Sequence, residues 1–211
     1  MKISIAPEPR TMRRIPLVAC VAVLALTVAA SLPRPADAAV GSPPVPANIQ
    51  VPAGHTLFLV GHAVGTQNYV CLPAGDGVKY VLFTPQATLF DDGKQITTHA
   101  FSPNPDEGGA VRPVWRHSRD TSAVWGKVNP GHASADPAYV APGAIPWFLI
   151  TVVGSEAGPG GGDMLTGTTF IQRLNTAGGA APSTGCGSPA WRSMASQSNS
   201  PVIERVVPTT A

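Results

Sequence analysis

The sequence predicts an all-β protein, either an antiparallel β-sandwich or a small β-barrel, with long Gly/Pro-rich loops and one disulfide. Short runs rich in Val, Ile, Phe, Trp and Thr follow one another at nearly regular spacing. The 22 glycines and 23 prolines of the chain punctuate these runs. No stretch shows sustained helical periodicity with capping residues, and no long sequence repeat is present.

Residues 1–38 have the pattern of a secretory signal peptide. A basic start precedes an apolar run from Ile15 to Leu32, and the small residues Ala36 and Ala38 follow. Because a signal peptidase reads small residues at these two positions, we expect cleavage after Ala38. The sequence therefore predicts a secreted, periplasmic or cell-envelope protein, with no membrane span once the signal peptide is removed.

Cleavage would change the charge balance of the chain. Residues 1–38 contain five of the 14 basic residues and two of the 12 acidic residues, which leaves 9 against 10 and a net charge of −1. A mature chain without a basic patch has no electrostatic footprint for a polyanion. Nucleic acid is therefore not expected as a partner.

Two cysteines follow the predicted cleavage site, Cys71 and Cys186. In an exported chain an even pair predicts a disulfide, and this spacing matches no metal-ligand or C-x-x-C pattern. Closing so long a loop would stabilise the fold by roughly 4–5 kcal/mol in the chain-entropy description. We interpret the small-residue segment before the second cysteine, Thr176–Gly185, as the stapled end of a sheet.

One all-β domain is expected over residues 51–186, after a Pro/Ala-rich lead-in over residues 39–50. The run His55–Pro73 is apolar and β-branched, and Gly65 within it marks either a junction between two strands or a bend. Further along, Asp92-Gly93 lies between Leu89-Phe90 and Ile96-Thr97 and predicts a tight hairpin turn.

The remaining elements follow from composition. Phe101–Pro113 is expected to be a loop because it contains three prolines, acidic residues and paired glycines. Residues 187–211 are expected to form a Ser/Pro-rich tail with at most one weak strand. The other expected strands are Lys79–Pro85, Val114–Ser118, Thr121–Asn129, Ala144–Val153 and Gly167–Asn175.

The familiar motifs of enzymatic chemistry are missing from the sequence. It contains no G-x-S-x-G, no dinucleotide-binding or phosphate-binding glycine motif, and no H-x-H or H-x-x-x-H pair. No cofactor and no metal site are therefore predicted.

Five segments occur in a distinctive order, namely PQATLFDDGK (Pro85–Lys94), His99, SAVWGKV (Ser122–Val128), AIPWFLI (Ala144–Ile150) and FIQRLNTAGGAAPSTGC (Phe170–Cys186). This succession resembles domain of unknown function 3455, a family of exported bacterial and fungal proteins. The resemblance implies a secreted single domain in which Cys71 bridges Cys186, and it implies no established reaction, substrate or cofactor. Residues 196–211 depart from it, since they replace an aromatic-rich final strand.

The first functional hypothesis is a non-catalytic exported domain that binds an unidentified extracellular or envelope ligand. Trp125 and Lys127 share one side of their strand because side chains alternate with period two. The candidate binding face combines them with the polar groups of Gln172, Arg173 and Asn175.

The second hypothesis is a secreted hydrolase or lyase with a site centred on His99. Lys127 and Arg173 would then serve as acid or oxyanion partners. A third possibility is a structural component of the cell envelope that binds no small ligand.

Overall fold

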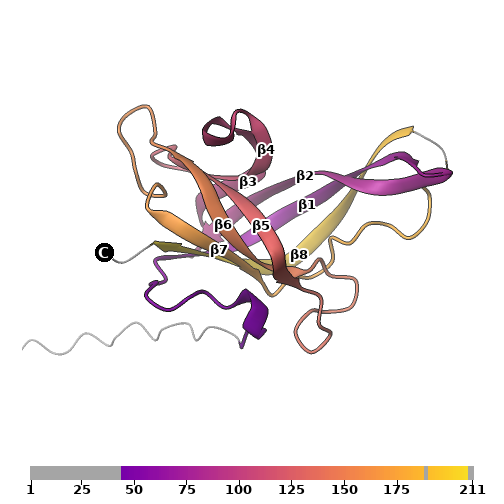
Figure 1. Ribbon diagram of the computed structural model, residues 1–211, viewed down its shortest axis with the longest axis horizontal. Helices are drawn as coiled ribbons and strands as arrows, with labels where there is room; N and C mark the ends of the chain where they lie inside the picture. The colour runs from indigo at the N-terminus through magenta and orange to yellow at the C-terminus, as the bar shows by residue number, and fades with distance from the viewer. Residues whose placement is uncertain (1–43, 188–189, 209–211) are drawn as a thin grey trace, which may run out of the picture. The chain divides into compact units, whose positions relative to one another are not determined.

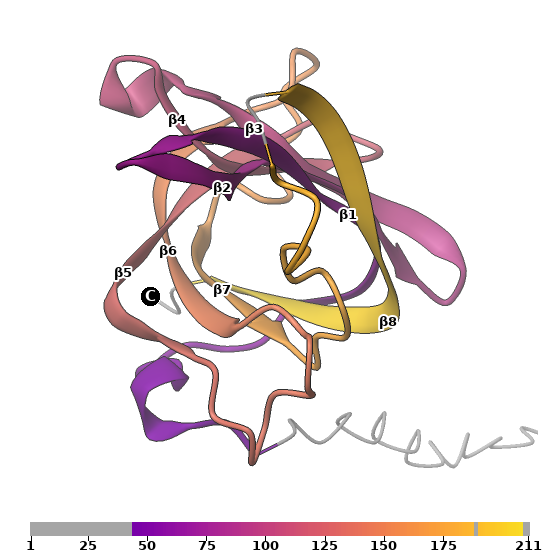
Figure 2. The same cartoon turned by 90° about the vertical axis from the view of Figure 1, so that its right-hand side faces the viewer.

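The computed structural model describes residues 44–187 and the backbone of residues 190–208, and the predicted signal peptide lies outside them. All of these residues belong to one unit, Ser42–Ala211. Eight antiparallel strands follow one another in chain order around a barrel, and the last strand pairs with the first (Figures 1 and 2). The all-β prediction is confirmed, and of its two alternatives the chain forms the barrel.

The sheet consists of a curled run of seven strands and a closing eighth strand. Two single-turn 3-10 helices, η1 (Ala47–Ile49) and η2 (Pro105–Glu107), accompany it. The strands are β1 (Leu59–Ala74), β2 (Gly77–Asp91), β3 (Lys94–Asn104), β4 (Ala110–His117), β5 (Ala123–Ser134), β6 (Trp147–Glu156), β7 (Thr168–Leu174) and β8 (Ala190–Pro208).

Gly65 is not a junction between two strands, because β1 runs through it as one continuous strand. A Cβ atom at this position would lie 2.1 Å from the carbonyl oxygen of Gln86 on β2. Glycine is therefore required for the close approach of the two backbones, rather than for separating two strands.

The tight turn predicted at Asp92-Gly93 is confirmed. Asp91 pairs with Lys94, and the two residues between them have φ values of 45° and 73°. Two consecutive positive φ angles match the right-handed twist of the flanking strands, which explains the Asp-Gly dipeptide.

The loop expected over residues 101–113 is shorter than its composition indicates. Strands β3 and β4 extend into it, with Phe101 opposite Pro113, and only residues 105–109 lie outside the ladder. Side-chain bonds stabilise this short connection. Asn104 accepts a hydrogen bond from the N–H of Asp106 and donates one to the carbonyl of Val153, and Arg112 pairs with Glu107 at 2.7 Å.

The C-terminal segment also differs from the expectation of a tail with one weak strand. Ala190–Pro208 forms β8, which pairs with β7 on one side and with β1 on the other. A closing strand forms backbone hydrogen bonds with two neighbouring strands. The stabilisation from this pairing cannot be predicted from the Ser-rich composition of the strand itself.

The described residues form one apolar cluster inside the barrel and two outside it, one of the outer two around Trp125. The inner cluster fills the end of the barrel at which Leu165, fully buried in the β6–β7 connection, packs against Trp115, Ile150 and Ile171. On the outer face, η1 of the lead-in buries Ile49 against β6 and β7.

Candidate functional site

The other end of the barrel interior is not filled by side chains and contains a cavity of about 170 Å³. Its lining is mainly apolar and aromatic, and every strand from β1 to β7 contributes to it. The lining residues are Gln67, Leu82, Pro85, His99, Phe101, Pro113, Trp115, Val128, Phe148, Ile150 and Arg173.

Strand alternation explains why these side chains meet. His99 lies opposite Trp115 and Phe101 lies opposite Pro113 in the β3–β4 ladder, so all four point to the same face. On β5 the inward position beside them is Gly126, where a Cβ atom would lie 2.4 Å from Cγ2 of Ile150 and 3.1 Å from Cζ3 of Trp115. The missing side chain therefore makes room for the indole that separates the cavity from the packed half of the barrel.

His99 forms the polar part of the cavity wall and is 8% exposed. Its Nδ1 lies 3.0 Å from the carbonyl oxygen of Val114, and its ring stacks on Trp115 with 4.3 Å between centroids. A carbonyl oxygen can only accept, so Nδ1 carries the proton. Burial lowers the pKa of His99 from 6.5 to about 4, with the charge of Arg173 adding to the effect, so the imidazole is neutral at pH 7.

Arg173 brings a positive charge to the same cavity from β7. Its guanidinium carbon lies 4.0 Å from the centre of the Phe148 ring, and Nε and Nη2 donate to the carbonyl of Pro146 at 3.1 and 2.7 Å. The guanidinium is thereby fixed in place by a cation–π contact and by backbone bonds.

The segment Thr176–Cys186, which we call the strap, crosses the cavity end of the barrel (Figure 2). The hydroxyl of Tyr69 donates to the carbonyl of Gly179 at 2.6 Å, and Thr176 donates to the carbonyl of Ile145 at 2.5 Å. Gly179 also packs beside Gln67, which lines the cavity. Burial raises the pKa of the Tyr69 hydroxyl, which keeps it in its donating form.

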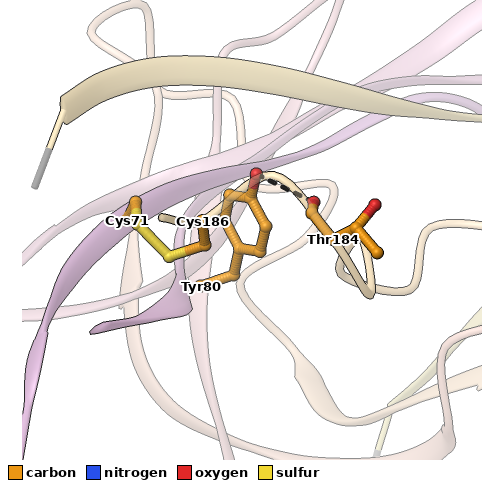
Figure 3. Close-up of a disulfide and its surroundings, with 4 residues drawn as sticks. All are labelled: Cys71, Tyr80, Thr184 and Cys186. Atoms are coloured by element: carbon orange, nitrogen blue, oxygen red, sulfur yellow. Dashed lines mark hydrogen bonds between the residues drawn. A yellow bond between two sulfur atoms is a disulfide. The ribbon is translucent and has the colours of Figure 1, made fainter. Parts of the chain in front are cut away.

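The far end of the strap is fastened covalently, as the sequence predicts. Cys71 and Cys186 form a disulfide with 5.6 Å between their Cα atoms. Beside it, the hydroxyl of Tyr80 donates to the carbonyl of Thr184 at 3.4 Å (Figure 3). The strap therefore joins β7 to the β1–β2 hairpin across the opening.

The residues singled out from the sequence separate into two groups. His99 and Arg173 both line the cavity. Trp125 and Lys127 share a face, as period two predicts, but this is the outer face of β5. Trp125 is 3% exposed and its indole N–H donates to Ser102 at 2.8 Å, while Lys127 is exposed.

Gln172 and Asn175 have roles in the backbone framework. Nε2 of Gln172 donates to the carbonyl of Ile49 at 2.6 Å and ties the lead-in to the outer face of β7. Asn175 has a φ of 52° and starts the turn that leads into the strap, a conformation that Asn tolerates better than most residues.

A His–Asp–Ser cluster lies at the packed end of the barrel, but its order does not fit nucleophilic catalysis. The Asp120 carboxylate accepts from Nδ1 of His117 at 2.9 Å and from Oγ of Ser122 at 2.8 Å, so the acid lies between the other two. In a catalytic triad the histidine lies between them. Ser122 is fully buried and also accepts from the N–H of Leu165, so the cluster anchors two turns to each other.

Sequence reasoning missed the apolar majority of the cavity wall. Phe101 and Pro113 fell within the segment read as a loop, and Phe148 and Ile150 within a run read as simply buried. Alternation along β3 and β4 is the signal that could have placed the first pair opposite each other.

Within residues 44–187 and 190–208, the helical segments are single 3-10 turns, and none meets the length or hydropathy that a membrane-spanning helix requires. In the same part of the chain, no three His, Cys, Asp or Glu side chains gather closely enough to hold a metal ion.

Comparison with known proteins gives one finding. Residues 52–197 match the family described as "Protein of unknown function (DUF3455)". This range covers β1 to β7, the strap and the start of β8. No curated protein and no solved structure matches the chain.

Proposed function

The chain belongs to this family of unknown function, DUF3455, and from that premise we propose that it is an exported, non-catalytic binding protein that holds a small apolar ligand inside its barrel. The observation that carries the proposal is the cavity of about 170 Å³ between the strap and the Trp115 floor. Small-molecule sites are typically concave, mainly apolar and supplied with a few fixed polar groups, as this one is.

The size of the cavity limits the ligand. An apolar cavity of about 150 Å³ in a folded protein accommodates benzene. A space of about 170 Å³ therefore suits a ligand built on one ring, or a branched aliphatic chain of similar volume. The aromatic walls of Phe101 and Phe148 favour the ring, because aromatic pairs gain energy beyond burial of area.

Catalysis centred on His99 has less support than binding. Lys127, expected as its partner, lies on the outside of the barrel. Among the residues that the structure describes, the lining of this cavity contains no Ser, Thr, Cys, Asp or Glu, so inside the cavity His99 has neither a nucleophile nor a carboxyl group beside it.

Export is supported by the disulfide and by the leader pattern of residues 1–38. Disulfides persist mainly in oxidising compartments outside the cytoplasm. Mass spectrometry of the protein recovered from the medium or periplasm should find Ala39 at its N-terminus. Recovery of the full-length chain from the cytoplasm alone would refute this part of the proposal.

Binding is tested with toluene, a neutral single-ring probe, by isothermal titration calorimetry and thermal shift. Val128→Phe places a larger side chain in the cavity and should weaken toluene binding at least tenfold. Val111→Phe is the matched control, because Val111 is 61% exposed and absent from the lining. Equal binding by all three proteins, or no binding by the unmodified protein, would refute the cavity as the site.

A further inference from the structure

His99 presents an unused hydrogen-bond acceptor at the cavity wall. Its Nδ1–H is donated to the carbonyl of Val114, and one face of the ring is covered by Trp115. In a neutral imidazole with a protonated Nδ1, the other nitrogen, Nε2, is an acceptor. None of the described residues forms a hydrogen bond with Nε2, although the side chain is only 8% exposed.

From this geometry we infer that the barrel selects a single-ring hydroxyl compound, of the phenol class, whose O–H donates to Nε2 of His99 while its ring occupies the apolar cavity. This inference rests on the proposed function, since it names the ligand class of the same site. The Nε2 atom is accessible rather than sealed off by protein. A ligand that brings an O–H therefore gains a hydrogen bond there that a ligand without one cannot form.

The surrounding groups disfavour other polar ligands of similar size. A carboxylate would be attracted by the guanidinium of Arg173, but it has no proton to donate, so its oxygens would face the lone pair of Nε2. An ammonium group could donate, but it would enter a cavity that already contains the positive charge of Arg173. A hydroxyl group avoids both conflicts, because it donates its proton while its oxygen carries partial negative charge next to the guanidinium.

The lowered pKa of His99 agrees with this picture. Burial lowers it to about 4, so the imidazole is neutral and Nε2 keeps its lone pair at pH 7. A protonated imidazole would instead offer a donor at Nε2 and would select a carbonyl or an ether.

The test compares four probes of similar size, toluene, anisole, phenol and benzoate, by calorimetric titration of the unmodified protein at pH 7. Phenol should bind roughly three- to tenfold more tightly than anisole and toluene, which lack the O–H. Equal affinities of phenol, anisole and toluene would overturn the inference and leave the proposed function standing. Tighter binding of benzoate than of phenol would also overturn it.

Failure of all four probes would refute the proposed function itself and the inference with it. Two variants assign the preference to His99. His99→Phe, which has no acceptor, should bind phenol and toluene equally, and His99→Gln, whose amide can both donate and accept, should restore part of the preference. If His99→Phe does not fold by circular dichroism, the four-probe comparison on the unmodified protein still decides the outcome.

Discussion

His99 on β3 is kept neutral by burial against β4, and this burial should lower the free energy of unfolding in acid. Its pKa is about 4 in the folded protein against 6.5 as a free side chain. The unfolded chain therefore binds more protons than the folded protein between these two values. The stabilising contribution is complete above pH 6.5 and is lost as the pH falls toward 4.

We predict that the free energy of unfolding falls by about 2 kcal/mol more between pH 7 and pH 5 in the unmodified protein than in His99→Gln. The measurement is urea denaturation at both pH values, monitored by Trp fluorescence. Asp120 and Glu107 also have lowered pKa values, but their effects belong to more acidic solutions, and comparison with the variant cancels them. The same pH dependence in both proteins would contradict the buried neutral imidazole.

Gly126 tests the packing beneath the cavity. Gly126→Ala adds a Cβ that meets Ile150 and Trp115 at less than the ordinary contact distance, and it should destabilise the fold by about 1–3 kcal/mol. Gly167→Ala is the control, since a Cβ there meets no atom within 4 Å and the change should stay within about 0.5 kcal/mol. If the two variants have the same urea midpoint, the close packing of Gly126 against Ile150 and Trp115 is refuted.

For single residues, the sequence predicts which side chains share a face of a strand, but not whether that face points into the barrel. Alternation correctly places Trp125 and Lys127 on one face of β5, but the pattern alone does not say which face points into a barrel. Both faces of β5 carry apolar residues, because the outer Trp125 packs in a cluster with Val114 and Ala123 and is bonded to Ser102 of β3. The polar side chain of Gln172 makes it a candidate for ligand binding, but the side chain is buried against the lead-in and its amide donates to the backbone carbonyl of Ile49.

The covalent attachment of the strap could be predicted from the sequence, but its path across the end of the barrel could not. Its glycines, proline and terminal cysteine indicate the end of a sheet tied to the rest of the domain, and the disulfide confirms the tie. Its path across the barrel end depends on Tyr69 and Ile145, which are remote in sequence. Such tertiary partners are not visible in the composition of a loop.

Replacing both cysteines by serine should lower the free energy of unfolding by about 2–5 kcal/mol, because the bridge joins residues 115 positions apart and restricts the unfolded chain. Tyr69→Phe removes one strap hydrogen bond and should cost only about 1 kcal/mol. Urea denaturation with and without reductant measures both effects. Reductant should not change the stability of the double serine variant. If reductant does not destabilise the unmodified protein, the disulfide does not contribute this stability.

The β3–β4 and β8 segments show why strand boundaries were harder to predict than strand existence. Prolines and paired glycines lowered the expectation for residues 101–113, but the ladder with Phe101 opposite Pro113 continues through them. For β8, pairing with two existing strands outweighs weak intrinsic preference. Both cases depend on neighbours that a local pattern does not include.

For the whole molecule, the all-β class could be predicted from periodicity, but the cavity could not. A cavity arises from the difference between the volume enclosed by the closed sheet and the volume of its inward side chains. In the packed half Leu165 and Trp115 fill that space, whereas in the other half Gln67, Pro85 and Val128 do not. The same closure brings His99 and Arg173 together from strands 74 positions apart in sequence.

The central claim, a ligand site inside the barrel, is tested most directly by nuclear Overhauser effects between bound phenol and the methyl groups of the protein. We predict contacts from the phenol ring protons to Val128 and Ile150, which line the cavity, and none to the exposed Val64 and Val111, which are absent from the lining. Contacts to these exposed methyl groups, or no contact at saturating phenol and toluene, would contradict the claim.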